Sequence, residues 1–96
     1  MIAVATTVDE SQTFTDLFPN PTSESFYFNY TGNNFSEPIN VILMNNNGKV
    51  VSVTEFIEFN KAQSLNILTI ETANGLYQVI ISQCDKKEIK RISVIH

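Results

Sequence analysis

Short runs in which apolar and polar residues alternate, each ended by turn-forming residues, recur along the whole chain. In the run Ser25–Tyr30, Phe26 and Phe28 alternate with Tyr27 and Asn29, which is the period of a β-strand with one buried face. No segment of useful length places apolar residues at helical spacing. Ile, Val and Thr, which favour strands, number 28, against four Ala and five Leu. The chain is therefore predicted to be all-β.

Seven such runs are separated by Pro, Gly and Asn residues that favour turns. The expected strands are Thr13–Phe18, Ser25–Tyr30, Ile39–Met44, Lys49–Phe59, Ser64–Thr72, Leu76–Ser82 and Glu88–Ile95. Lys49–Phe59 is either one long strand or two pieces joined by a bulge. Pro19 and Pro21 must end the first of them, because proline lacks the backbone donor that a strand ladder needs. About seven short strands joined by turns are typical of an antiparallel two-sheet β-sandwich.

The strongest turn signal is Asn47-Gly48, between the third and fourth expected strands. Asn-Gly between two strands favours a primed hairpin turn, whose two central residues both take positive φ. Two further turns are expected at Ala73–Gly75 and at Cys84–Lys87. All three turns join consecutive strands, which again favours antiparallel sheets.

With 96 residues the chain is long enough for one domain and too short for a second core. Residues 1–12 are interpreted as a linker or lead-in segment. Their apolar part lacks the basic start of a signal peptide and is interrupted by Thr residues. The domain itself is expected to span residues 13–96.

The composition argues against catalysis, metal binding and nucleic-acid binding. The single histidine is His96 at the chain end, so a nucleophile would have no neighbouring base. One cysteine and one histidine cannot form the Cys/His cluster that holds zinc. The net charge of −4 disfavours contact with phosphate, and the apolar runs are too short to span a bilayer. We therefore expect no enzyme activity, no cofactor, no bound nucleic acid and no membrane insertion.

Two features near the C-terminal end have competing interpretations. Cys84, close to Lys86 and Lys87, is either a reactive thiol or, as we favour, a half-buried structural cysteine. Lys86, Lys87, Lys90 and Arg91 hold four of the six basic residues. They either protect a sheet edge from aggregation or form a docking patch for an acidic partner.

Several apolar residues fall on faces that the alternation assigns to the outside. They are Ile42, Met44, Ile67, Leu76 and Ile80. On neighbouring strands they would form an exposed apolar patch, which marks an interaction surface. Another strand or subunit is expected to cover this patch, as in a homodimer through the outer sheet face, or a partner is expected to bind it.

Five short motifs follow one another from about Phe14 to Ile95. They are Leu17–Pro21 (LFPNP), Ile39–Leu43 (INVIL), Asn47–Val51 (NGKVV), Gly75–Ile81 (GLYQVII) and Lys90–Val94 (KRISV). In this order they resemble the type A C-terminal sorting domain of the type IX secretion system, by which Gram-negative bacteria export proteins across the outer membrane. The family pattern is an aromatic residue before Pro-Asn-Pro, a Gly-Lys or Gly-Arg hairpin, a Gly-x-Tyr strand start and a basic-apolar end.

This resemblance implies an Ig-like sandwich at the C-terminal end of a larger exported protein. The expected function is a non-catalytic secretion signal, read by an outer-membrane translocon and often removed at the cell surface by a sortase-like peptidase. The cargo is then anchored at the surface or released. If such a peptidase acts on this chain, the polar stretch Asp9–Thr13 is the expected place of cleavage.

The resemblance also assigns partner recognition to the positions that match the family motifs. These are Pro19, Asn20, Pro21, Gly48, Lys49, Gly75, Tyr77, Lys90 and Arg91. Backbone conformation and burial explain Gly48, Gly75 and Tyr77 without a partner, so we favour a structural role for these three. The three basic residues have no evident role in folding and are the stronger candidates for contact.

Two features depart from the family pattern. Thr72 stands where the family usually has leucine, and the chain begins at Met1 with almost no cargo and no signal peptide. We therefore expect an excised domain or a fragment of a longer product. The alternative function is an Ig-like adhesion or carbohydrate-binding module of a secreted enzyme, for which Tyr27 and Tyr30 are the candidate aromatic platform.

Overall fold

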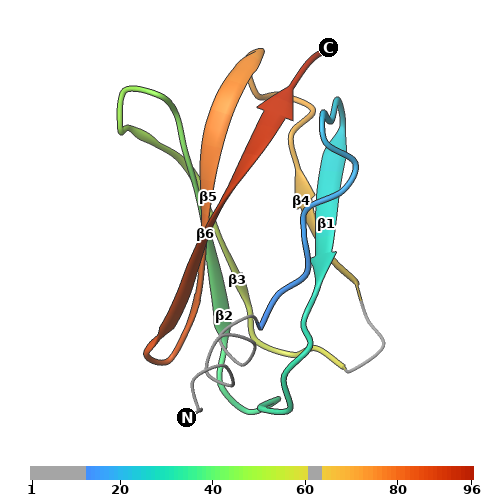
Figure 1. Ribbon diagram of the computed structural model, residues 1–96, viewed down its shortest axis with the longest axis vertical. Coiled ribbons are helices and arrows are strands. Elements are labelled where there is room, and N and C mark those ends of the chain that lie inside the picture. Colours follow the sequence, from blue (N-terminus) through green and yellow to red (C-terminus); the bar gives the residue numbers. More distant parts are fainter. Residues whose placement is uncertain (1–12, 61–63) are drawn as a thin grey trace, which may run out of the picture.

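The computed structural model describes residues 13–60 and 64–96, so the lead-in segment 1–12 lies outside the described residues. Its strands are β1 (Ser25–Asn29), β2 (Ile39–Met44), β3 (Val50–Phe56), β4 (Ser64–Leu68), β5 (Gly75–Gln83) and β6 (Lys86–Val94). One sheet holds β1 and β4, the other has the order β3-β2-β5-β6, and all strand pairs are antiparallel. The two sheets form two facing layers (Figure 1). The prediction of an all-β antiparallel two-sheet fold is confirmed.

The expected strand Thr13–Phe18 does not form, so the described residues contain six strands where about seven were predicted. The segment still runs beside β1, through isolated bridges from Phe14 to Tyr30 and from Phe18 to Tyr27. Phe14 and Phe18 are four positions apart, whereas their partners are three positions apart. This extra residue interrupts the ladder in the way a β-bulge does.

The core lies between the two sheets and is built from inward-facing residues of both. Its fully buried large apolar side chains are Phe14, Phe26, Phe28, Ile39, Val41, Leu43, Leu65, Val79, Ile81, Ile92 and Val94. Phe14 and Phe28 meet edge to face, with ring centroids 5.7 Å apart. Burying each such side chain stabilises the fold by roughly 1.5–3 kcal/mol. The core therefore holds the strand ends, and the turns between them, in fixed positions.

One outward assignment, in β4, is wrong. Ile67 was expected to face outward but is buried opposite Phe26, while Leu68 and Ile70 are exposed. The adjacent apolar pair Ile67-Leu68 fits either register, and pairing with the buried face of β1 decides between them. The other residues assigned to the outside are half-buried or exposed: Ile42, Met44, Leu76 and Ile80.

The hairpin between β2 and β3 is not the primed turn that was predicted. The Gly48 N–H donates to Asn45 O at 3.0 Å, which closes a turn over Asn46 and Asn47. Gly48 has a φ of 83°, whereas Asn46 and Asn47 do not take positive φ. This is the three-residue loop in which a glycine after the turn forms a bulge. The Asn45 side chain also stabilises the turn, because its Oδ1 accepts hydrogen bonds from the N–H groups of Asn47 and Lys49, both at 2.9 Å.

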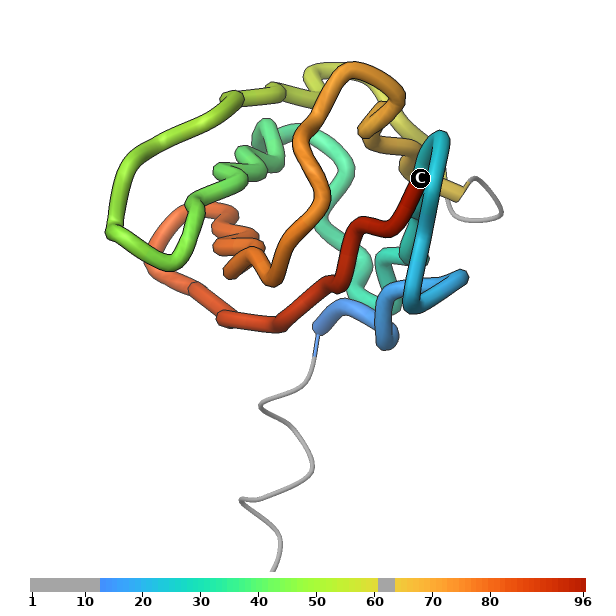
Figure 2. Tube along the Cα trace, turned by 90° about the horizontal axis from the view of Figure 1, so that it is seen from above, coloured from blue at the N-terminus to red at the C-terminus, as the bar shows by residue number. Residues whose placement is uncertain are grey.

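The segment before β1 joins the two sheets. Residues 13–18 bond to β1, and four positions later Thr22 bonds to β6. There the Thr22 N–H donates to Ser93 O and the Ile95 N–H donates to Thr22 O, both at 2.8 Å. Viewed from above, the C-terminal end of the chain accordingly lies beside this segment (Figure 2).

Candidate recognition surface

The turn Pro19–Pro21 lies against the outer edge of β6. The Asn20 side chain bonds to the β6 backbone twice: Nδ2 donates to Arg91 O at 3.1 Å, and Oδ1 accepts from the Ser93 N–H at 3.0 Å. Asn20 therefore does with its side chain what a neighbouring strand would do with its backbone, and it covers part of an exposed sheet edge. Both proline peptide bonds of the turn are cis.

Lys49 lies at the tip of the β2–β3 hairpin and is exposed. Its position is set by Gly48, at which a Cβ would meet no atom within 4 Å. The positive φ, rather than close packing, is thus what requires glycine here. The hairpin presents the Lys49 side chain to solvent at one end of the sandwich.

Gly75 and Tyr77 begin β5 and have structural contacts of their own. Tyr77 is buried, and its hydroxyl donates to Ala73 O at 2.6 Å. Gly75 has a φ of 155°, and a Cβ on it would lie 3.6 Å from the Tyr77 ring. These contacts agree with the structural role that we favoured for both residues.

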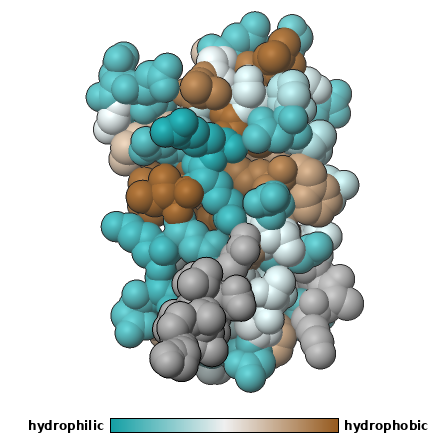
Figure 3. All heavy atoms as spheres, viewed as in Figure 1, coloured by the Kyte–Doolittle hydropathy of each residue, from teal (hydrophilic) through white to brown (hydrophobic). Residues whose placement is uncertain are grey.

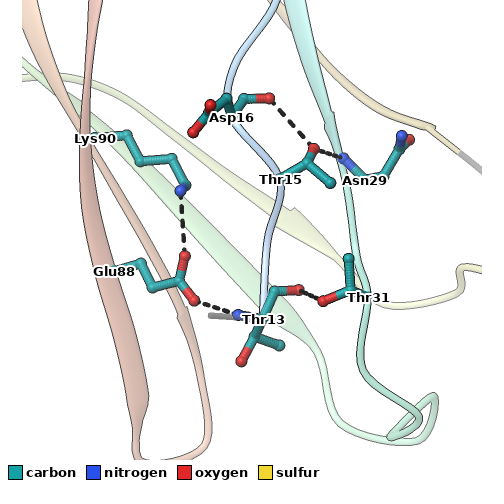
Figure 4. Close-up of polar contacts among 7 residues, drawn as sticks. All are labelled: Thr13, Thr15, Asp16, Asn29, Thr31, Glu88 and Lys90. Atoms are coloured by element: carbon teal, nitrogen blue, oxygen red, sulfur yellow. Dashed lines mark hydrogen bonds and ion pairs between the residues drawn. The ribbon is translucent and has the colours of Figure 1, made fainter. Parts of the chain in front are cut away.

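Lys90 and Arg91 are neighbours in β6 and point to opposite faces of the sheet. Lys90 faces inward, where its Nζ lies 3.3 Å from Glu88 Oε1 and both side chains are mostly covered. The second oxygen of the Glu88 carboxylate accepts the Thr13 N–H (Figure 4). Arg91, by contrast, is exposed on the outer face. Lys90 therefore has a partner within the chain, which the sequence motif alone did not reveal.

A shallow hollow connects the hairpin, β5 and β6 on the outer face of the four-stranded sheet. It has a volume of about 250 Å³ and is lined by Asn46, Leu76, Tyr77, Gln78 and Arg91. Two predicted residues, Tyr77 and Arg91, thus share one site.

The other predicted residues, Lys90 apart, lie around this hollow. Gly48 and Lys49 belong to the hairpin whose residue Asn46 lines it, and Asn20 bonds to the backbone of Arg91. The hairpin, the start of β5 and the turn before β1 all lie towards the end of the sandwich that also carries the C-terminus (Figure 1).

Asn46, Leu76 and Gln78 line the hollow but were not among the predicted site residues. Alternation indicates two of them, because Leu76 and Gln78 flank the inward-facing Tyr77 and so must face outward. Leu76 was already assigned to the outer apolar patch on this ground, whereas Gln78 was not singled out. Asn46 has no such signal, since its place depends on the shape of the hairpin.

An aromatic platform for a sugar does not form from Tyr27 and Tyr30. Tyr30 is only 5% exposed, and its hydroxyl donates to Gln83 Oε1 at 3.0 Å. Tyr27 is half-buried and packs against Phe18, with ring centroids 4.2 Å apart. The observation that would have supported a carbohydrate-binding module is therefore missing.

The structure also shows the surroundings of Cys84 and of the residues that could bind a metal. Cys84 is exposed, not half-buried as predicted, because it occupies the two-residue turn between β5 and β6 with a φ of 55°. Among residues 13–60 and 64–96, no three His, Cys, Asp or Glu side chains gather as metal ligands. The same residues form no helix of the length and hydrophobicity that crossing a membrane requires.

Comparison with known protein families gives a match that extends over most of the chain. The model of the family described as the secretion system C-terminal sorting domain matches residues 16–95. No curated protein matches the chain. Members of this family are non-catalytic parts of type IX secretion, and each directs its cargo protein to be secreted or attached at the cell surface. The resemblance seen in the sequence is thereby confirmed: the chain belongs to the family of secretion system C-terminal sorting domains.

Proposed function

We propose that the type IX machinery recognises this domain at the end of the sandwich that carries Lys49, Arg91 and the turn Pro19–Pro21, here called the recognition end. The observation that carries the proposal is the hollow, because residues of the hairpin, of β5 and of β6 line it together. The hydrogen bonds of Asn20 to Arg91 and Ser93 would add the turn Pro19–Pro21 to the same surface. Motifs far apart in the sequence would thus be read as one surface.

Charge indicates what kind of partner the recognition end suits. Lys49 and Arg91 are exposed cations on a chain whose net charge is −4, so they offer a local positive surface to an acidic partner. Pro19, Asn20, Pro21, Gly48, Gly75 and Tyr77 would hold the shape of this surface. Lys90 would take part only after release from Glu88, so we expect it to contribute least.

Three partners are proposed. An outer-membrane translocon would read the recognition end, and a sortase-like peptidase would later cut within Asp9–Thr13, ahead of a domain that spans residues 13–96. The third partner is a second copy of the chain, bound through the outer face of the four-stranded sheet.

We also infer an Ig-like topology for the sandwich. In support, residues 13–18, β1 and β4 are three strand-like segments in one layer, and the four strands of the other sheet bring the total to seven. In that second sheet β5 and β6 form a hairpin beside β2. The hydrogen bond from the Tyr77 hydroxyl to Ala73 O, near the start of β5, resembles the tyrosine corner of such domains. An experimental structure in which residues 13–18 pair with another strand instead of β1 would contradict this topology.

The test is delivery of a passenger. A signal peptide, a monomeric fluorescent protein and residues 1–96 are fused and expressed in hosts with and without a working type IX translocon. We expect passenger outside the cell only in the competent host, with the domain trimmed off and the cut located by mass spectrometry. Retention of the folded fusion in the periplasm of both hosts would contradict the proposal.

Charge reversal then tests the recognition end itself. Lys49→Glu and Arg91→Glu should each lower delivery by about tenfold, equivalent to about 1.4 kcal/mol of binding, because an acidic partner is repelled. Lys86→Glu is the matched control, since Lys86 is exposed beside the β5–β6 turn at the opposite end of the sandwich. Unchanged delivery with both variants folded would remove these residues from the recognition surface.

A further inference from the structure

The outer face of the four-stranded sheet carries a straight row of four apolar residues, one from each strand. Ile42 of β2 is paired with Val53 of β3 on one side and with Ile80 of β5 on the other, and Ile80 is paired with Ile89 of β6. Val53 and Ile89, at the two ends of the row, are 63% and 60% exposed. Figure 3 shows hydrophobic spheres at mid-height on the left of the molecule, over the four-stranded sheet. Four exposed or half-buried apolar residues in register make a continuous apolar strip rather than scattered surface residues.

The next row towards the β5–β6 turn is polar, with opposite charges at its two ends. Asn40 is paired with Glu55 of β3 and with Ser82 of β5, and Ser82 is paired with Lys87 of β6. The face therefore has a carboxylate at one edge and an ammonium at the other, with an apolar strip alongside. When two copies of this face meet with their β3 and β6 edges opposed, each carboxylate can therefore lie opposite an ammonium of the other copy.

The row on the other side of the strip runs from Val50 through Met44 and Gln78 to Arg91. Its only charged residue is Arg91, on the same edge as Lys87. A second sheet laid over this face must therefore place no cation opposite Arg91 or Lys87.

Two sheets that stack face to face keep their strands within about 30° of each other. A two-fold axis parallel to the strands then places β3 of each copy opposite β6 of the other. Glu55 faces Lys87 of the second copy at both ends, and Val53 lies opposite Ile89 while Ile42 lies opposite Ile80. A two-fold axis perpendicular to the strands would instead bring Lys87 opposite Arg91, which repel each other.

We propose that this face binds a second copy of the chain about the strand-parallel axis, with the apolar strips packed together and a Glu55–Lys87 pair at each end. The inference deepens the proposed homodimer and rests on it, but not on the secretion role. Four strands about 4.8 Å apart make the face only roughly 15–20 Å wide, so the dimer is weak and forms as concentration rises.

Sedimentation velocity of the 96-residue chain over a series of concentrations tests the pairing. The average mass should rise from one chain towards two. Glu55→Lys and Lys87→Glu should each weaken dimerisation by about tenfold or more, because each places like charges together at both ends. The double variant E55K/K87E should restore the dimer. Glu71→Lys is the matched control, since Glu71 is exposed in the turn before β5 and lies off this face.

Three results would overturn the proposal: a monomer at every concentration, single variants that dimerise as well as the parent, or a double variant that stays monomeric. Ile80→Asp tests the strip itself and should abolish the dimer. Circular dichroism checks that each variant is folded. If a charge-reversal variant unfolds, Glu55→Gln or Lys87→Gln takes its place. A parent chain that stays monomeric but delivers the fluorescent passenger normally refutes this inference alone. A parent chain that dimerises but fails to deliver the passenger refutes only the recognition end.

Discussion

The two halves of the segment before β1 are adjacent in sequence yet are held in different ways. Residues 13–18 place Phe14 and Leu17 in the core and exchange several backbone hydrogen bonds with β1 and with Thr31. Residues 19–22 put no large apolar side chain in the core and lie on the edge of β6 instead. The first half is held mainly by burial and the second mainly by hydrogen bonds.

The difference follows from the residues in each half. Pro19 and Pro21 have no N–H, so the main chain of this turn offers few donors to a sheet edge. The Asn20 amide supplies one donor and one acceptor in their place. A chain can thus move from one sheet to the other without a regular strand, provided that a side chain takes over the pairing.

Phe14→Ala should have the largest effect, because it removes the buried anchor of the first half. Truncating a fully buried phenylalanine costs about 3–5 kcal/mol, a large part of the stability of a domain this small. The free energy of unfolding in urea measures it. Phe18→Ala, in the same segment but at a partly exposed position, should cost clearly less, and equal costs would refute burial as the main contribution.

Asn20→Ala should have a smaller effect, of about 1–2 kcal/mol, because water reaches this edge and replaces part of the lost bonding. Hydrogen exchange should locate the change: the Ser93 amide, which donates to Asn20, should exchange faster while the Phe18 amide, which donates to Tyr27 O, stays protected. Asn66→Ala on the outer face of β4 is the control. Equal acceleration at both amides would mean that the two halves open together, and the comparison would then be wrong.

Much of the fold could be predicted from the sequence, and the failures have local causes. Alternation located six of the seven expected strands, because it directly reports which face is buried. It failed at Thr13–Phe18, where one extra residue breaks the ladder, and at Ile67-Leu68, where adjacent apolar residues suit both registers. The primed turn expected from Asn47-Gly48 was wrong for another reason: the Asn45 side chain, rather than a positive φ at Asn47, stabilises the turn.

The site was predictable as a set of residues but not as a surface. Asn20 and Arg91 were both singled out, but the hydrogen bond between them runs from the Asn20 side chain to the backbone oxygen of Arg91. Because every residue has that backbone oxygen, the sequence does not indicate this bond. The opposite directions of Lys90 and Arg91 follow from alternation alone. The ion pair of Lys90 does not, because it depends on how closely residues 13–18 approach β6.

Substitutions of Glu88 test the comparison between the two halves with the smallest expected effect. Glu88 lies in β6 and accepts the Thr13 N–H, so it also connects the first half to β6. Glu88→Gln keeps an oxygen that can accept the Thr13 N–H but removes the attraction to Lys90, whereas Glu88→Ala removes both. If burial dominates the first half, the Gln variant should lose clearly less stability than Phe14→Ala, even though the Glu88–Lys90 pair is mostly covered.

Salt separates the two contributions of Glu88. Stability of the parent should fall slightly from low to high ionic strength as the ion pair is screened, and that dependence should be weaker in the Gln variant. The extra loss in the Ala variant then measures the hydrogen bond to Thr13. If E88A destabilises the domain as much as F14A, the start of the segment is held by its polar contact with β6 rather than by the core. The contrast between a half held by burial and a half held by hydrogen bonds would then no longer hold.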